Sequence, residues 1–203
     1  MTALSRLTAA AIASTAWAGL GIQFASTYGR SGSMSGTLWA MLRYFTVTTN
    51  LAAAILLTGL AASVAACVAP RVLAGIALAM GLVGIVYHTL LRGLLAVSGG
   101  DAIADRLLHA AMPVMVPLFW LAFVRKGALG RSDPFLWLLY PALYWLYALA
   151  RGLADGRYAY PFLDAERLGW GRTALNGVCL ALGFLAAGFA LVGLDATLGR
   201  RAR

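Results

Sequence analysis

The chain has 203 residues, of which 62% are hydrophobic and only 11% are charged, and its mean hydropathy is +0.82. These values exclude an ordinary soluble domain, in which about 25% of residues are charged. The formal net charge of +9 would suit a nucleic-acid binder in a soluble chain, but here the basic residues flank apolar segments, as membrane-interface anchors do. We therefore expect an integral membrane protein that contacts lipids and binds no nucleic acid.

Six apolar segments follow one another along the chain and predict six membrane-spanning helices. A bilayer core about 30 Å thick requires roughly 20 mostly apolar residues per helix. The expected spans are residues 7–24, 38–60, 72–95, 103–123, 135–149 and 173–194. The sequence thus predicts an all-α, six-transmembrane helical bundle, a single integral membrane domain over residues 1–203, with both termini on the same side of the membrane.

The basic residues also indicate a location and an orientation. All of them are arginine except Lys126, a bias that, with the abundant Ala, Gly and Leu, suggests a GC-rich bacterial genome and hence the bacterial inner membrane. Basic residues are equally numerous on the two predicted faces, but the 125–131 joint and the C-terminal tail contain little acid. We therefore expect cytoplasmic termini.

Three polar residues lie at similar depths from the same membrane face. Thr46 lies about 12 Å from the start of the second span, His109 about 9 Å from the start of the fourth and His88 about 10 Å from the end of the third, at about 1.5 Å per residue. Polar side chains at such depth are costly against lipid and usually face a bundle interior or a wet cavity. We expect these three to line one cavity.

Helical spacing groups further polar residues with this site. On the second span, Arg43 and Asn50 fall on the same stripe as Thr46. On the fourth span, Asp105 precedes His109 by one turn, where a carboxylate fixes the tautomer of an imidazole and raises its basicity. A polar stripe on the fifth span should face inward, because its hydroxyls require partners; it consists of Tyr140, Tyr144, Tyr147 and Arg151.

Each of these residues also has a structural interpretation. An intramembrane Thr commonly bonds the carbonyl four residues earlier, and an intramembrane His commonly pairs within the bundle. Tyr residues near an interface commonly belong to the aromatic belt, and Arg43 can extend its head group to the interface. The shared depth of Thr46, His88 and His109 favours the functional interpretation.

Three short segments resemble one family of membrane enzymes. They are residues 43–46 (Arg-Tyr-Phe-Thr), 109–113 (His-Ala-Ala-Met-Pro) and 160–164 (Tyr-Pro-Phe-Leu-Asp). With them the chain, from the second to the sixth span, resembles the androgen-induced-gene family of six-span membrane threonine hydrolases and its bacterial relatives, the Pr-six-Pr membrane proteins. Tyr160 and Asp164 of the third segment join the residues that we expect to support catalysis or bind the substrate.

The resemblance implies an intramembrane hydrolase of lipid esters, similar to hydrolases of fatty acid esters of hydroxy fatty acids, with Thr46 as nucleophile and His109 as base. It implies no cofactor and no metal. A Thr hydroxyl needs an adjacent base to attack an ester, and a neutral imidazole can supply one. We expect Asp105 to orient His109 and His88 to be a second candidate base.

The other supporting residues would act on the substrate. Arg43 or Arg92 would bind a lipid carboxylate at the interface. Asn50 or a Tyr hydroxyl of the fifth span would stabilise the acyl oxyanion. The amphipathic loop at residues 151–172 should close over the cavity as a lid.

Two departures from the family pattern leave alternatives open. The family places an acidic or Asn residue three positions after the Thr, whereas the segment Val47-Thr48-Thr49-Asn50 is one residue longer, so Thr48 or Thr49 is an alternative nucleophile. A position that is commonly acidic in the family, ten residues after the His, is Phe119.

Two other functions agree with the same residues. His88 and His109 on neighbouring spans could ligate one haem in an electron carrier. A small transporter or a non-enzymatic membrane scaffold is the other alternative, because Pro113 and Pro117 interrupt the fourth span as in transporters with broken helices.

Overall fold

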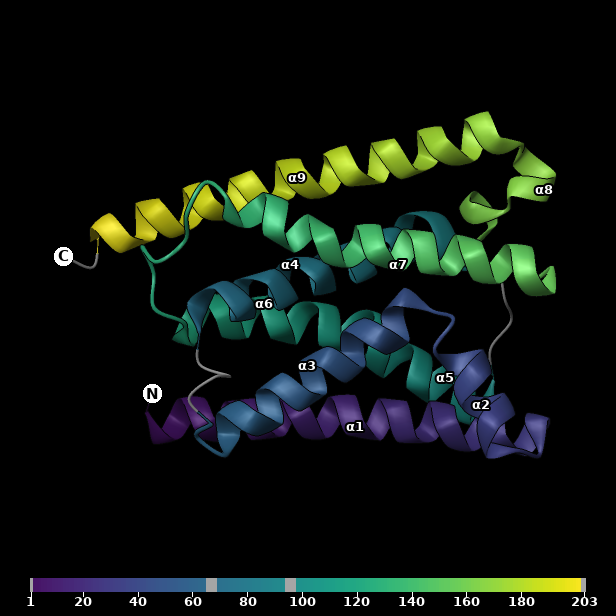
Figure 1. The fold of residues 1–203 in the computed structure, drawn as a ribbon. Helices are drawn as coiled ribbons and strands as arrows, with labels where there is room; N and C mark the ends of the chain where they lie inside the picture. Colours follow the sequence, from purple (N-terminus) through teal and green to yellow (C-terminus); the bar gives the residue numbers. More distant parts are fainter. Residues whose placement is uncertain (1, 65–68, 94–97, 202–203) are drawn as a thin grey trace. The chain divides into compact units, whose positions relative to one another are not determined.

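The structure is a computed structural model that describes residues 2–64, 69–93 and 98–201, and these contain helices and no β-strand (Figure 1). The all-α prediction is therefore confirmed for the described residues. The elements are α1 Ala3–Ser31, α2 Met34–Met41, α3 Phe45–Ala61, α4 Pro70–Val86, η2 Tyr87–Leu91, α5 Gly99–Arg106, η3 Leu107–Ala111, α6 Met112–Phe123, α7 Asp133–Asp155, η4 Pro161–Leu163, α8 Ala165–Leu168 and α9 Trp170–Arg201.

Four of the described helices are long and apolar enough to cross a membrane: α1, α4 continued by η2, α5 continued through η3 to α6, and α9. The bent pair α2 and α3 makes a fifth if it counts as one span. Helix α7 has 23 residues, enough to cross a bilayer, but its Tyr, Trp and Pro residues lower its mean hydropathy. The structure thus supports a helical membrane protein, while the sixth span and the side of the termini remain predictions.

The contacts divide the chain into two compact units. Unit 1 comprises residues 1–42 and 46–126, and unit 2 comprises residues 43–45 and 127–203. In unit 1, α4 packs against α6, and α1 packs against α2, α5 and α6. In unit 2, α7 packs along α9, as Figure 1 shows.

Glycines allow the helices of unit 1 to approach closely. A Cβ atom on Gly19 of α1 would lie 2.7 Å from Leu108 Cδ2, and one on Gly84 of α4 would lie 2.8 Å from Pro113 Cβ. Small residues at helix contacts are a common device of membrane bundles, because dispersion forces rather than the hydrophobic effect hold such helices together. The pair Gly84 and Pro113 fixes the crossing of α4 and α6.

The second predicted span is broken, so the expectation of one helix over residues 38–60 was wrong. Helices α2 and α3 meet at 99°. A break in apolar surroundings leaves backbone groups that need partners. Tyr144 donates its hydroxyl to the carbonyl of Arg43 at 2.6 Å, and the hydroxyl of Tyr160 accepts from the Phe45 N–H at 3.0 Å. Arg43 therefore precedes α3 and does not share a helical stripe with Thr46.

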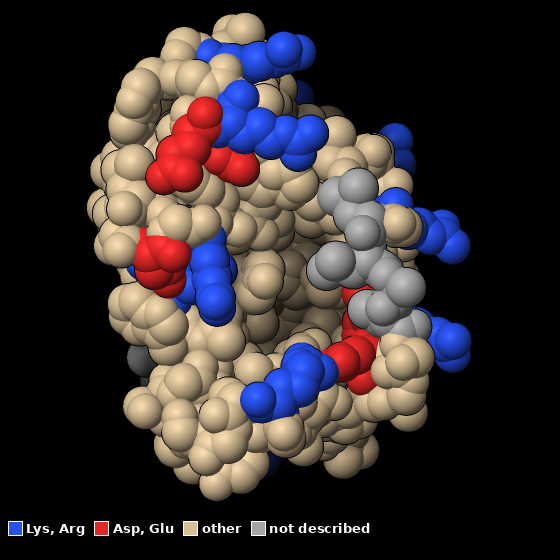
Figure 2. Space-filling view, turned by 90° about the vertical axis from the view of Figure 1, so that its right-hand side faces the viewer, with Lys and Arg blue, Asp and Glu red and all other residues tan. Residues whose placement is uncertain are grey.

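Charged side chains gather at the ends of the helices. On the face that Figure 2 shows, acidic side chains (red) lie beside basic ones (blue). Within unit 1, Arg30 pairs with Asp101 at 2.6 Å, and within unit 2, Arg43 pairs with Asp155 at 2.5 Å. Such placement agrees with the expectation that the charges lie at membrane interfaces.

Candidate active site

His109 lies in a π-helical segment, η3, whose cause can be read from the sequence. Pro113 has no backbone N–H and cannot continue the helical ladder. The N–H of Met112 bonds the carbonyl of Leu107, five residues earlier. The Leu108 carbonyl therefore loses its helical donor and accepts instead from Asn50 Nδ2 at 3.3 Å. Single π turns often occur at functional sites, and this one contains His109.

Thr46 and His109 form the central contact of unit 1. Thr46 lies in the first turn of α3, and its Oγ1 is 3.1 Å from His109 Nε2. Only 6% of Thr46 is exposed. The two residues are 63 positions apart in the sequence, so the packing of α3 against η3 alone brings them together.

Asp105 lies on the other side of the imidazole. Its Oδ1 is 3.0 Å from His109 Nδ1, although the carboxylate is out of line with the direction in which that N–H would point. Because a carboxylate only accepts, this contact favours the tautomer with the ring proton on Nδ1. The lone pair of Nε2 is then directed at the hydroxyl of Thr46.

Tyr87 is a fourth member of this group that the sequence analysis missed. Its hydroxyl donates to Asp105 Oδ2 at 2.5 Å, and its ring stacks on the His109 ring with centroids 4.2 Å apart. Tyr87 lies in the other π-helical segment, η2, directly before His88. The sequence signal was a Tyr one residue from a candidate His, which carries little information without the fold.

Asn50 has a structural role that corrects one prediction. Its Nδ2 donates to the carbonyls of Thr46 and Leu108, at 2.9 and 3.3 Å, so both N–H bonds are used. Its Oδ1 is buried and meets no donor among the described residues. Asn50 is fully buried and both of its N–H donors are used, so the side chain is unsuited to stabilise an oxyanion.

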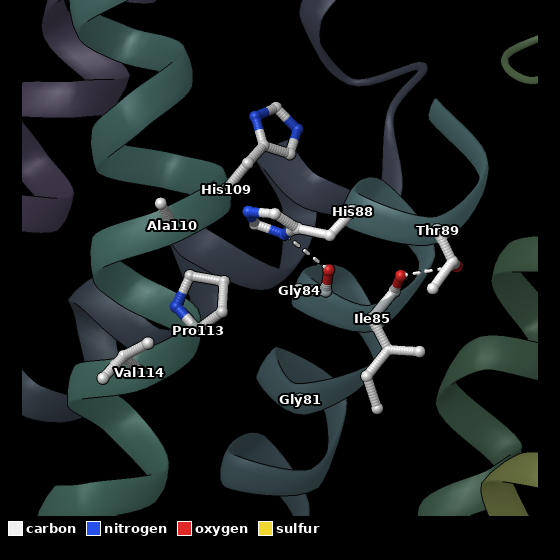
Figure 3. A pocket seen from close by; sticks show the side chains of 9 residues that line it. All are labelled: Gly81, Gly84, Ile85, His88, Thr89, His109, Ala110, Pro113 and Val114. Carbon is white, nitrogen blue, oxygen red and sulfur yellow. Dashed lines mark hydrogen bonds between the residues drawn. The ribbon is translucent and has the colours of Figure 1, made fainter. Parts of the chain in front are cut away.

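His88 shares an open groove with His109 (Figure 3). His88 Nδ1 is 2.9 Å from the Gly84 carbonyl, and since a carbonyl only accepts, that nitrogen carries the proton and Nε2 keeps a lone pair. The groove measures about 440 Å³. It is lined by Gly81, Gly84, Ile85, His88, Thr89, His109, Ala110, Pro113 and Val114.

The prediction of one cavity shared by Thr46, His88 and His109 therefore needs a correction. The two histidines line the groove, whereas Thr46 is absent from the residues that line it and reaches the site through its contact with His109. The reason is the break before α3, which places Thr46 in a helical first turn packed against η3.

Arg43 is engaged within unit 2, so of the two arginines predicted to hold a lipid carboxylate the structure favours Arg92. Its guanidinium bonds both oxygens of Asp155 and the carbonyl of Arg157, and only 6% of the residue is exposed. The bidentate pair uses the donor fork that a lipid carboxylate would need. Arg92, the other candidate, is exposed after η2, where its N–H bonds the carbonyl of Tyr87.

The polar stripe of α7 also belongs to unit 2. Tyr144 and Arg151 are buried, while Tyr147 is 40% exposed, so the stripe faces inward only in part. The Tyr147 hydroxyl accepts from Arg151 at 2.8 Å, and the ring of Tyr140 packs 5.0 Å from that of Phe45. The contact of Tyr140 with Phe45 and the bond from Tyr144 to the Arg43 carbonyl hold the break before α3.

The loop predicted as a lid is folded onto unit 2. Asp164 caps α8 by accepting from the Arg167 N–H at 2.9 Å. Phe162 stacks on Trp145, and its carbonyl accepts from Asn176 at 3.0 Å. The Tyr-Pro-Phe-Leu-Asp segment therefore has structural contacts to α7 and α9, and its action as a lid remains a prediction.

Comparisons of the chain with protein-family models, with curated proteins and with solved structures gave no match.

Proposed function

We propose that the protein is an intramembrane lipid-ester hydrolase in which Thr46 is the nucleophile, His109 the general base and Asp105 the group that orients the imidazole. One observation carries the proposal. The Thr46 hydroxyl, both nitrogens of His109 and the Asp105 carboxylate form one line of contacts, with distances of 3.1 and 3.0 Å. A nucleophile next to a base that is itself oriented by a third group is the general signature of covalent acyl transfer.

The arrangement supports a two-step reaction. Thr46 Oγ attacks the ester carbonyl carbon while its proton passes to His109 Nε2, and the C–O bond to the alcohol then breaks. His109 gives the proton to the departing alcohol oxygen, which leaves an acyl-threonine. Water, deprotonated by the same nitrogen, attacks that ester and releases the fatty acid and the free hydroxyl of Thr46. The negative charge of Asp105 stabilises the imidazolium that forms in each step.

The first turn of α3 supplies the oxyanion donors in this proposal. The first N–H groups of an α-helix have no intrahelical partner, and α3 begins at Phe45. The N–H groups of Thr46 and Val47 therefore point out of the helix end next to the nucleophile. Fixed backbone donors at a developing oxyanion are among the largest contributions to catalysis. In this proposal these N–H groups stabilise the oxyanion in place of Asn50, whose N–H groups already donate to the carbonyls of Thr46 and Leu108.

The alternatives are supported less well. Haem ligation needs one imidazole nitrogen of His109 directed at iron, but Nε2 contacts Thr46 and Nδ1 contacts Asp105. A small transporter remains a second candidate, because the bent pair α2 and α3 is a broken helix of the kind that transporters use. A location in the bacterial inner membrane with cytoplasmic termini belongs to the same proposal as the hydrolase.

Covalent labelling tests the proposal. A long-chain alkyl fluorophosphonate forms an O–P bond with an activated hydroxyl and releases fluoride. We expect the protein in lipid nanodiscs to be labelled at Thr46, and we expect both labelling and hydrolysis of a p-nitrophenyl fatty ester to be lost in Thr46→Ala and in His109→Ala. Thr48→Ala and Thr49→Ala are the matched controls and should keep most of both. Equal activity of Thr46→Ala and wild-type protein would refute the assignment.

A further inference from the structure

The groove that His109 and His88 share runs along the contact of α4 with α6. In Figure 3 the two imidazoles lie at one end of the groove, and Gly81 and Val114 lie toward the other. Gly81 and His88 are separated by seven residue steps, which correspond to about 10 Å of helix at about 1.5 Å per residue. The groove therefore leads away from the proposed catalytic base along the direction of the membrane-spanning helices.

Glycines keep this groove open. A Cβ atom on Gly81 would meet nothing within 4 Å, so the space beside this residue is unfilled. A Cβ on Gly84 would instead lie 2.8 Å from Pro113 Cβ, so at that level α4 and α6 are in contact. The contact between Gly84 and Pro113 forms the floor of the groove, and the missing side chain at Gly81 leaves open space at the far end from the histidines.

The residues that line the groove indicate which kind of ligand it can bind. Apart from the two histidines at one end and the Thr89 hydroxyl, which bonds the Ile85 carbonyl at 2.7 Å, the lining consists of Gly, Ala, Pro, Val and Ile. Ile85 and Val114 are 64% and 57% exposed, so the groove opens on the outer surface of two helices that can cross a membrane. An apolar channel with polar groups at one end suits a chain with a single polar head.

We propose that this groove binds the acyl chain of the ester substrate, with the carbonyl at the histidine end and the chain running toward Gly81. The inference rests on the proposed hydrolase function and adds to it the place where the acyl chain lies and the residue that limits the length of this chain. Gly81 is the residue that determines which chain length the groove accepts.

Chain-length dependence tests this inference. In Gly81→Phe, a large side chain fills the groove away from the reacting atoms. We expect kcat/KM for p-nitrophenyl palmitate to fall at least about tenfold, since each buried methylene contributes about 0.8 kcal/mol, while kcat/KM for p-nitrophenyl butyrate changes less than about threefold. Gly81→Ala should show a smaller change in the same direction. Gly21→Phe on α1, where a Cβ also meets nothing within 4 Å, is the matched control.

A binding measurement separates this inference from the hydrolase proposal. A palmityl ether that carries a diazirine at the chain end cannot be hydrolysed and labels the residues it contacts. In Thr46→Ala protein we expect light-dependent labelling of Ile85 and Val114, competed by palmitate ester and lost in Gly81→Phe.

The outcomes of these two measurements are distinct. A wild-type protein that hydrolyses neither ester defeats the hydrolase proposal, and the diazirine labelling then still decides the groove. A Gly81→Phe protein that hydrolyses palmitate and butyrate esters in the wild-type ratio defeats the groove alone. Labelling of exposed Val178 and Leu182 on α9 as strongly as of the groove residues would also overturn it.

Discussion

Replacement of Asp105 by Asn is the most informative single change in this site. Asn has the shape of Asp and can still accept the hydrogen bond from Tyr87, which donates to Asp105 Oδ2 at 2.5 Å. The substitution therefore removes the negative charge beside His109 and leaves the packing of α5 in place. Activity should fall while the thermal unfolding temperature hardly changes.

The size of the loss follows from the contact distance. At the 3.0 Å that separates Asp105 Oδ1 from His109 Nδ1, Coulomb's law gives about 5.5 kcal/mol at an effective dielectric constant of about 20 and about 1.4 kcal/mol in water. Both side chains are 21% exposed, which places the site between these limits, at about 3 kcal/mol. Since about 1.4 kcal/mol is a factor of ten in rate, kcat should fall about a hundredfold.

Steady-state hydrolysis of a p-nitrophenyl ester by protein in nanodiscs measures this effect. Asp101→Asn is the matched control, because Asp101 lies one turn earlier on α5 and pairs with Arg30 at 2.6 Å. It should keep kcat within about twofold, as expected for an exposed ion pair. Equal losses in the two variants would show that the charge of Asp105 does not act on His109. Adding Asp105→Asn to Thr46→Ala should cost little more, since the residues act as one unit.

Three further predictions concern neighbouring contacts. Tyr87→Phe keeps the ring stack but removes the bond to the orienting carboxylate, and kcat should fall about tenfold, the value of one charge-assisted hydrogen bond; a wild-type rate would exclude this role. Thr46→Ser should retain measurable fluorophosphonate labelling, because the hydroxyl remains in place. If Thr49→Ala lost labelling and Thr46→Ala kept it, the nucleophile would instead be Thr49, about one helical turn further along α3. Arg43→Met removes the bidentate partner of Asp155, whose side chain is 27% exposed, and should destabilise unit 2 by about 2 kcal/mol, the value of a hydrogen bond to a charged group, measured by thermal unfolding. The double variant with Asp155→Leu should recover part of the loss.

The sequence by itself determined the helical class and the membrane environment. Long apolar segments can satisfy their backbone groups in lipid only as helices. The described residues of the predicted spans are largely helical, although residues 38–60 form two helices, α2 and α3, and not one. It also brought Asp105 and His109 together, because a spacing of four residues places two side chains on one helical face. The common depth expected for Thr46 and His109 led to the prediction that they are close, and they are in contact. The depth of Thr46 was counted along a continuous helix over residues 38–60, however, and the structure breaks that helix before α3.

Only the tertiary structure decided which partners the polar groups take. Arg43 pairs with Asp155 across 112 positions, and Tyr87 reaches Asp105 across 18; helical periodicity contains no information about such pairs. The break before α3 has the same origin, because the hydroxyls of Tyr144 and Tyr160 make it tolerable. Local sequence sets the direction of a side chain on its own helix, and the packing of helices against one another sets what that side chain meets.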